Sequence, residues 1–188
     1  MVTIRQFRDE DAPTLWALNN LPNIGATADP AIPLPLPPIS QPPPRFPDLA
    51  NIRSSFQDAG GDFLVAEINS HLVAMGGIRP NSHGQAEVLR VRVHPATRRQ
   101  GIGRTLMTAL EARAWQLGLP ETHLDTATNQ PEAIAFYRSL GYQEVGRDHQ
   151  SGWSWTLVYF VKILRSGPRP VGKKSTTSPS PNNDEPPP

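Results

Sequence analysis

The chain has 188 residues, a formal net charge of +1 and no cysteine. Its length suits one globular domain, and the near-neutral charge gives no general signal for nucleic-acid or membrane binding. The lack of cysteine excludes disulfides, thiolate metal sites and a cysteine nucleophile. Because no secretory signal or membrane-spanning apolar run is visible, we expect a cytoplasmic protein.

Proline is concentrated in two segments of the chain. Nine of the 22 prolines lie between Pro30 and Pro47, and seven lie between Pro168 and Pro188. Proline lacks a backbone N–H and restricts the residue before it, so neither segment can form regular structure. We therefore predict a domain over residues 1–166 with a proline-rich insertion at 30–47, and a disordered Pro/Ser-rich tail over 167–188.

The first half of the domain alternates strands with short helices. Asp11 and Asp48 each precede a helical segment and are residues that favour helix N-caps. Asn69 and Ser70 separate two apolar runs, which indicates a hairpin. The predicted elements are strand 2–7, helix 12–18, helix 49–57, and strands 63–68, 72–78 and 86–93.

The second half opens with the longest helix, predicted over residues 103–117. Its apolar stripe consists of Ile102, Leu106, Leu110, Ala114 and Leu117 at helical spacing. A strand over 122–127 follows, and Asn129 with Glu132 resembles a capping box that begins a helix ending at Leu140. Strands over 142–145 and 155–163 complete an α/β protein of the α+β sandwich type. We expect a central, mixed and mostly antiparallel sheet flanked by helices.

Between the strand at 86–93 and the long helix lies a loop with the character of a phosphate cradle. Glycines allow close backbone approach, and the unpaired N–H groups of a helix start attract anions. The basic side chains of this region are Arg90, Arg92, Arg98, Arg99 and Arg104. The loop lacks the Gly-Lys-Ser/Thr of a Walker loop and the third glycine of a dinucleotide fingerprint, where Leu106 stands.

The run Arg98-Arg99-Gln100-Gly101-Ile102-Gly103 closely resembles the acyl-CoA-binding motif of the GCN5-related N-acetyltransferase (GNAT) superfamily. Asn129, Ala133 and the run Phe136–Tyr142 resemble the second signature of that family. Ile4-Arg5 followed by Asp9-Glu10-Asp11 resembles its usual opening. The resemblance covers about residues 2–164, except for the proline-rich insertion. It implies a GNAT-like acyl-CoA N-acyltransferase fold with acetyl-CoA as cosubstrate.

The resemblance implies which residues bind the cofactor. The backbone of the cradle would hold the pyrophosphate, and the strand end at Val91 and Val93 would offer backbone groups to the pantetheine arm. Asn129 would contact the same arm, although an N-cap role explains an asparagine there equally well. The implied cofactor-binding residues are Val91, Val93, Arg98, Arg99, Gln100, Gly101, Ile102, Gly103, Arg104 and Asn129.

Two residues are candidates for acid–base catalysis. Tyr137 stands where the family usually has its general acid, and the alternative is a core aromatic on the 131–140 helix. Glu87 resembles in placement the catalytic glutamate of the family's histone acetyltransferases. The alternative for Glu87 is an exposed strand residue paired with an arginine. The five histidines show no metal-ligand spacing, so we expect no metal.

The sequence therefore predicts an N-acetyltransferase in which a primary amine attacks acetyl-CoA directly within a ternary complex. The acceptor stays open between a small molecule and a peptide or protein amine, and the chain is expected to be a monomer or a homodimer. The alternative is a non-catalytic acyl-CoA-binding sensor, or an adapter that uses its proline-rich segments as polyproline ligands.

Overall fold

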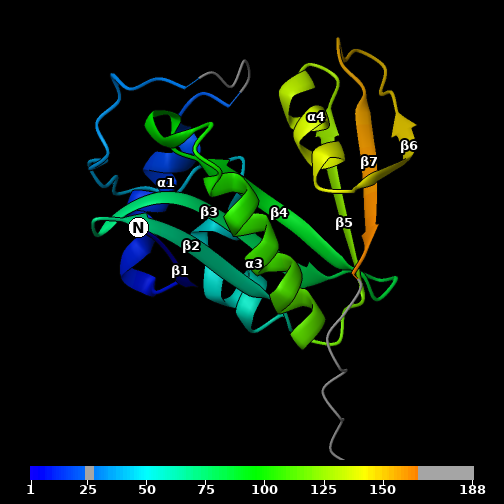
Figure 1. Ribbon diagram of the computed structural model, residues 1–188, viewed down its shortest axis with the longest axis horizontal. Coiled ribbons are helices and arrows are strands. Elements are labelled where there is room, and N and C mark those ends of the chain that lie inside the picture. The colour runs from blue at the N-terminus through cyan, green and yellow to red at the C-terminus, as the bar shows by residue number, and fades with distance from the viewer. Residues whose placement is uncertain (24–27, 165–188) are drawn as a thin grey trace, which may run out of the picture.

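The computed structural model describes residues 1–23 and 28–164, and the predicted tail at 167–188 lies outside this range. At its centre the described residues form one sheet in the order β1-β2-β3-β4-β5-β7-β6 (Figure 1). The strands are β1 Val2–Gln6, β2 Asp62–Ile68, β3 His71–Pro80, β4 Ala86–Val93, β5 Glu121–Ala127, β6 Gln143–Asp148 and β7 Leu157–Ile163. Within this sheet β4 and β5 are parallel, and the other neighbours are antiparallel. The predicted mixed, mostly antiparallel sheet is confirmed.

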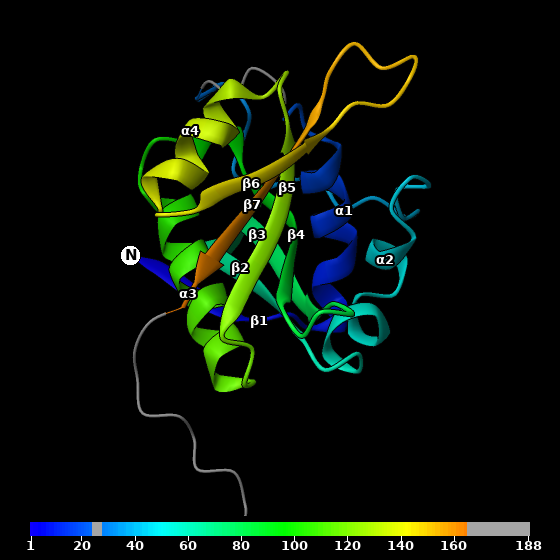
Figure 2. The same ribbon diagram turned by 90° about the vertical axis from the view of Figure 1, so that its right-hand side faces the viewer.

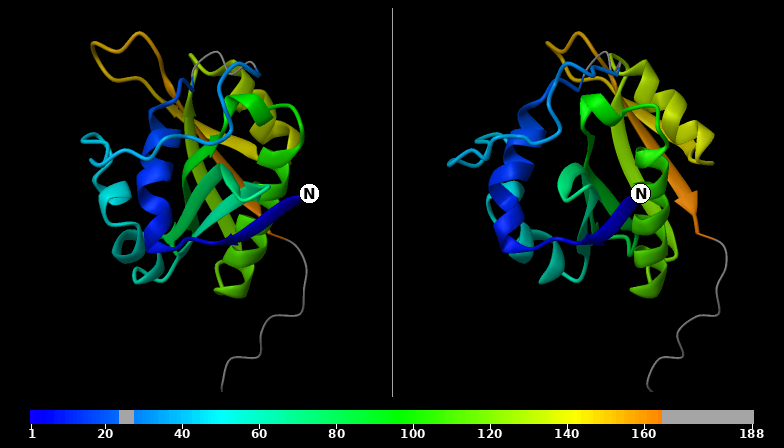
Figure 3. Two further views of the ribbon diagram at one scale, coloured as in Figure 1. Left: turned by 90° about the vertical axis from the view of Figure 1, so that its left-hand side faces the viewer. Right: turned by 60° about the vertical axis from the view of Figure 1, so that its left-hand side comes forward.

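Helices cover both faces of the sheet (Figures 2 and 3). Helices α1 (Ala12–Asn20) and α2 (Pro47–Ala50) lie on one face, and α3 (Ile102–Gln116) and α4 (Pro131–Ser139) lie on the other. Each face has its own apolar cluster, and we call them the α1 cluster and the α3 cluster. The α1 cluster includes Leu15, Leu49, Phe56, Phe63 and Met75. The α3 cluster includes Val88, Ile102, Leu106, Leu110 and Phe160.

Two predictions about local structure are confirmed closely. Four residues of the predicted α3 stripe (Ile102, Leu106, Leu110 and Ala114) are at most 2% exposed. The β2–β3 hairpin turns at Asn69 and Ser70, whose φ angles of 49° and 64° are the left-handed values that a two-residue hairpin turn requires.

The prediction of one helix over 49–57 is wrong, because the chain forms two short helical segments there. Helix α2 ends at Ala50, where the backbone of Asn51 leaves the helical region, and a π-helical turn follows over Arg53–Gln57. That turn buries Phe56 completely against Phe63, with ring centroids 5.0 Å apart. Tertiary packing of one aromatic side chain thus overrides the local preference for a continuous helix.

The predicted side-chain caps do not form. Asp11 stands at the N-cap of α1, but its carboxylate accepts hydrogen bonds from Arg5 at 2.7 and 2.8 Å instead of capping the helix. Asp48 lies inside α2 and pairs with Arg90 at 2.8 Å. The predicted capping box at Asn129 is also wrong, because Gln130 is the N-cap of α4 and its side chain makes no capping bond. In each case a tertiary contact or a one-residue shift of the helix start replaces the local pattern.

Strand ends differ by a few residues from the prediction. Strand β6 begins after Tyr142 and continues to Asp148, and β7 begins at Leu157, so Trp155 belongs to the preceding loop. There it stacks on Trp153 with ring centroids 4.0 Å apart. No helix in the described part of the chain is both long and apolar enough to cross a membrane.

Candidate active site

The site lies where β4 and β5 separate. These two parallel strands pair only at Ala86 with Thr122 and at Glu87 with His123. Beyond that point they diverge, and β5 carries β7, β6 and α4 away from the rest of the sheet (Figure 1). The gap opens a cavity of about 1080 Å³, walled by residues 88–93 of β4, residues 125–127 of β5, the start of α3 and the inner side of α4.

A β-bulge bends the β4 wall of this cavity. The β3–β4 register jumps between Met75 and Gly77, and Arg90 has a left-handed φ of 58°. A bulge leaves the extra residue unpaired in the ladder. Val91 and Val93 line the cavity while their side chains pack against the α3 cluster. Both valines thus belong to the cavity wall and to the face of the sheet that α3 covers.

The loop between β4 and α3 forms a concave backbone surface. Arg99 and Gly101 both have left-handed φ angles, 64° and 82°, and Gly101 is the N-cap of α3. The amides of Ile102, Gly103 and Arg104 belong to the first helical turn and have no acceptor inside the helix. An added Cβ at Gly103 would lie 3.3 Å from the Phe136 ring, so a larger side chain there would displace the aromatic wall of the cradle.

The polar side chains of the loop are differently placed. Arg98 donates to the carbonyl of Val93 at 3.2 Å and to that of Pro22 at 2.7 Å, and Arg104 donates to the hydroxyl of Ser139 at 3.2 Å. Gln100 donates back to the Ala96 carbonyl at 3.3 Å and lies outside the cavity lining. The other nine predicted cofactor residues, Asn129 included, do line the cavity.

His94 fixes this loop to the proline-rich segment. The side chain is fully buried, Nε2 donates to the carbonyl of Pro33 at 3.0 Å, and Nδ1 accepts from the amide of Ala96 at 3.1 Å. These two bonds require the neutral ring. Burial lowers the pKa of His94, and the charge of Arg98 lowers it further.

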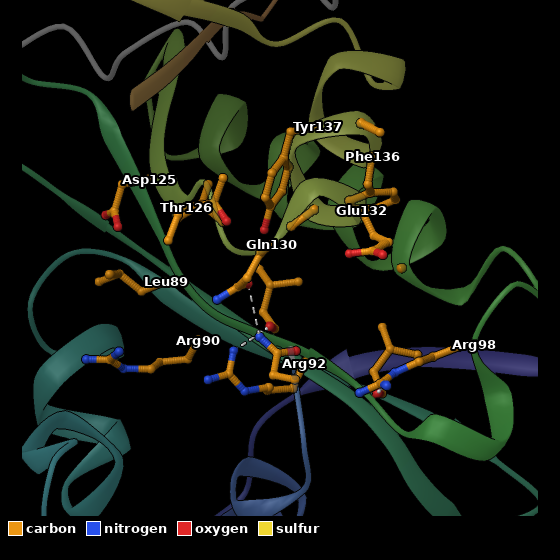
Figure 4. A pocket seen from close by; sticks show the side chains of 18 of the residues that line it. Leu89, Arg90, Arg92, Arg98, Asp125, Thr126, Gln130, Glu132, Phe136 and Tyr137 are labelled. Atoms are coloured by element: carbon orange, nitrogen blue, oxygen red, sulfur yellow. Dashed lines mark hydrogen bonds between the residues drawn. The ribbon is translucent and has the colours of Figure 1, made fainter. Parts of the chain in front are cut away.

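Tyr137 reaches into the cavity from α4. In Figure 4 its hydroxyl lies beside Gln130, the N-cap of α4, and points toward the β4 wall that carries Arg92. Loss of water around the ring raises the pKa of Tyr137 to about 12, with Arg92 acting to lower it and Asp125 to raise it. The phenol therefore stays protonated and offers a hydrogen-bond donor to whatever occupies the cavity.

The two carboxylates near the cavity differ in position. Glu87 lies at the closed end of the β4–β5 pair, accepts from Arg79 at 3.1 Å and does not line the cavity. Asp125 does line it, two residues beyond the strand partner of Glu87. Partial desolvation and the nearby charge of Glu87 raise the pKa of Asp125. Sequence reasoning missed Asp125 as a site residue, although its place near the end of the strand predicted over 122–127, just before Asn129, was an available signal.

Arg92 is a further residue whose role the sequence did not assign. It lies on β4 across from Tyr137, and the two are labelled on facing walls in Figure 4. Its Nη1 donates to the carbonyl of Val91 at 3.2 Å, while its Nε is buried without a hydrogen-bond partner.

Comparison with known proteins agrees with this geometry. The sequence profile described as "Acetyltransferase (GNAT) family" matches residues 31–142. The chain belongs to the GNAT family. Among curated relatives it is 29% identical to rat (Rattus norvegicus) N-acetyltransferase 8F1 over 128 residues, which are 65% of this chain and 58% of that protein. It is 30% identical to human N-acetyltransferase 8, covering 63% of this chain and 57% of the relative. The chain therefore spans less than two thirds of the length of these relatives.

Solved structures have the same fold. A GNAT-family acetyltransferase from Staphylococcus aureus superposes with a TM-score of 0.68 at 18% identity, covering 88% of this chain and all of the other. The putative acetyltransferase yncA from Salmonella typhimurium, solved with acetyl-CoA, gives a TM-score of 0.65 at 19% identity, covering 91% and 98%. The GNAT-like fold predicted from the sequence is confirmed. Within residues 1–23 and 28–164, no three His, Asp or Glu side chains are grouped to hold a metal ion.

The buried neutral His94 predicts a pH dependence of stability. Its pKa is lower in the folded than in the unfolded protein, where it is about 6.5, so the unfolded state binds the extra proton first. The free energy of unfolding should fall as the pH drops below that value and level off below the folded-state pKa. Urea unfolding at pH 7.5 and pH 5 measures this, and His94→Gln should lose less stability between the two pH values. An equal loss in both proteins would contradict the assignment.

Proposed function

We propose that this protein is an N-acetyltransferase that transfers an acetyl group from acetyl-CoA to a primary amine by direct attack in a ternary complex. The observation that carries the proposal is the continuity of the cavity. One space joins the amide-lined start of α3 to the Tyr137 hydroxyl through the gap between β4 and β5. A phosphate-bearing cofactor with a long arm and a reactive thioester fits such a space from end to end.

In this proposal the cradle holds the pyrophosphate of acetyl-CoA. The first-turn amides of α3 and the dipole of that 15-residue helix favour an anion at this position. Arg99 and Arg104 add positive charge at the cavity rim, and Arg98 holds the loop to the backbone of Val93. The backbone of Val91 and Val93 and the side chain of Asn129 line the route of the pantetheine arm.

The bulge and Tyr137 then act on the thioester. As the amine nitrogen attacks, negative charge develops first on the carbonyl oxygen, and a backbone N–H freed by the bulge near Leu89 or Val91 stabilises it. When the carbon–sulfur bond breaks, Tyr137 donates a hydrogen bond to the leaving sulfur. A thiol has a pKa of about 8.5, so a phenol with a pKa of about 12 stabilises the thiolate mainly as a hydrogen-bond donor.

The amine must lose a proton to become nucleophilic, and both carboxylates are candidates for accepting it. Glu87 is the base that the sequence resemblance implies. Asp125 has the stronger support, because it lines the cavity and its pKa is raised toward the range useful for a base. In this arrangement Asp125 takes the proton, and the charge of Glu87 raises its basicity.

The adapter alternative has less support. The segment at 30–47 is anchored to the domain by its leucines, since Leu34 packs against the α3 cluster and Leu36 against the α1 cluster. His94 also binds the carbonyl of Pro33, and the amide of Ile39 donates to the carbonyl of Pro13 at 3.1 Å. These contacts favour a structural role for the segment.

Acetyl-CoA should stabilise the protein. A ligand at a hundredfold over its dissociation constant adds about 2.7 kcal/mol, which corresponds to a Tm increase of roughly 5–10 °C for a domain of this size. Gly103→Val should abolish the increase, because the added side chain meets Phe136. Gly146→Val, on β6 outside the cavity, is the matched control and should keep it. A folded wild-type protein without any Tm increase would overturn the proposed function.

Tyr137→Phe should separate catalysis from binding. The substitution keeps the ring contacts with Phe136 and Tyr142 but removes the hydroxyl. We expect kcat to fall by about 10²-fold while the Kd for acetyl-CoA stays within a factor of about two, as measured by stopped-flow CoA release and by calorimetry. An unchanged kcat would remove Tyr137 from the mechanism.

Asp125→Asn and Glu87→Gln should give different pH profiles. If Asp125 is the base, Asp125→Asn lowers kcat by about 10²-fold or more and removes the acidic limb of the profile. Glu87→Gln should retain that limb but move it to lower pH, because it removes a negative charge that raises the pKa of Asp125. A larger loss in Glu87→Gln than in Asp125→Asn would assign the base to Glu87.

A further inference from the structure

One part of the cavity wall, the stretch of β4 that carries Arg92, is not explained by acetyl-CoA binding. In the β3–β4 ladder Arg92 lies opposite Met75, which belongs to the α1 cluster, whereas Val91 and Val93 pack against the α3 cluster. Residues directly opposite each other in an antiparallel pair share a face of the sheet. The Arg92 side chain is therefore on the α1 side of β4, away from the face that α3 covers.

Arg92 is a half-buried cation that has no ion-pair partner among the described residues. Its Nε has no hydrogen-bond partner, and within the described ranges no carboxylate lies at ion-pair distance from its guanidinium. The neighbouring Arg90 is different, because Asp48 pairs with it at 2.8 Å and the ring of Phe46 lies 4.3 Å below its guanidinium. Taking a charge partly out of water without a partner costs folding free energy. An anionic group on a bound ligand would supply the missing counter-ion and offset this cost.

That counter-ion does not belong to the pyrophosphate cradle. The cradle is formed by the first turn of α3 and the loop that includes Arg98, whereas Arg92 lies below Gln130 and faces Tyr137 (Figure 4). A group held by Arg92 would therefore be near the reaction centre on the acceptor side. Asp125, with its negative charge, lines the same cavity on β5. The cavity thus offers a cation and an anion to one ligand.

We infer that the acceptor is a small amine that also bears a carboxylate, and that Arg92 binds this carboxylate. The planar guanidinium of an arginine can donate two parallel hydrogen bonds to a carboxylate, which the ammonium group of a lysine cannot do. An amino-acid-like acceptor fits both charges, since its carboxylate is directed to Arg92 and its ammonium group to the carboxylate of Asp125. The inference rests on the proposed acetyltransferase function and specifies its substrate class. It also makes Arg92 a specificity-determining residue.

The test compares each amino acid with its carboxamide, a neutral analogue that lacks the carboxylate charge. The panel consists of the common L-amino acids and their α-carboxamides, with O-phosphoethanolamine and taurine as phosphate and sulfonate probes. For the best amino acid, kcat/KM should exceed that of its carboxamide by about 10- to 100-fold, as expected for a hydrogen bond between two charged groups. Preference for phosphate or sulfonate over every carboxylate, or equal rates for acid and amide, would overturn the inference.

Arg92→Met tests the residue itself. The acid-to-amide ratio should fall to near one, mainly through a higher KM for the acid, while the Kd for acetyl-CoA stays within a factor of about two. Arg53→Met removes the same charge from an exposed site outside the cavity lining and should keep the ratio. A role of Arg92 in binding acetyl-CoA would instead raise the Kd for acetyl-CoA, and this result would contradict the assignment.

Thermal stability and direct acceptor binding provide two further measurements. Because Arg92→Met removes a half-buried cation that has no ion-pair partner, its Tm should be equal to or above that of the wild type. A purely structural Arg92 would instead give a lower Tm. If no acceptor in the panel is turned over, the same acid and amide pairs are titrated into the CoA-saturated protein. No preference for the acid there would overturn the inference. Failure of acetyl-CoA itself to bind would instead overturn the proposed function.

Discussion

The separation of β4 from β5 is the constraint on which the site depends. Two residue pairs join the strands, and the bulge at Arg90 then bends β4 away from its partner. Without the bulge, β4 would continue the ladder and its backbone groups would be paired across the sheet. With it, the backbone beyond Glu87 faces a cavity, and α4 is carried far enough on the β5 side to direct Tyr137 across the gap.

This separation leaves backbone polar groups of both strands without strand partners in the middle of a sheet. Such groups must be satisfied by water or by a ligand, because an unpaired buried amide or carbonyl is costly. A long amide-containing arm placed between the strands would satisfy groups on both. Arg99 carries a cost of a different kind, because its left-handed backbone is strained for a residue with a side chain. This strain is retained in the loop that turns the helix start toward the cavity.

The sequence predicted those parts of the fold that depend on local chemistry. The α3 stripe, the hairpin at Asn69-Ser70 and the glycine loop before α3 each follow from residue periodicity or backbone freedom within a few positions. The parts that it did not predict depend on contacts between distant segments. From the local sequence Asp48 is predicted to cap a helix, but its carboxylate instead accepts a hydrogen bond from Arg90, 42 residues further along the chain. The lack of an ion-pair partner at Arg92 is likewise visible only in the structure. There Asp48 pairs with Arg90, and no described carboxylate pairs with Arg92.

The same distinction explains why Glu87 appeared the better base from sequence and Asp125 from structure. Each is an acid within a predicted strand, and only the resemblance distinguished Glu87. The position where the strands part puts Glu87 before the opening and Asp125 within it. Asp125 lies two residues past His123, the β5 partner of Glu87 in the last β4–β5 pair, and this position decides which carboxylate lines the cavity.

The proline-rich segment gains a physical role from its attachments. The carbonyl of Pro33 accepts a hydrogen bond from His94, and just before the segment the amide of Asp29 donates to the Pro95 carbonyl at 3.0 Å. At the far end, Phe46 and the adjoining Asp48 of α2 contact Arg90. The loop proposed for the cofactor and the wall proposed for the acceptor are thus joined by one stretch of chain. Proline lowers the entropy that such a stretch loses on ordering. A flexible linker of the same length would hold Asp48 against Arg90 less firmly, and Arg90 would then compete with Arg92 for an acceptor carboxylate.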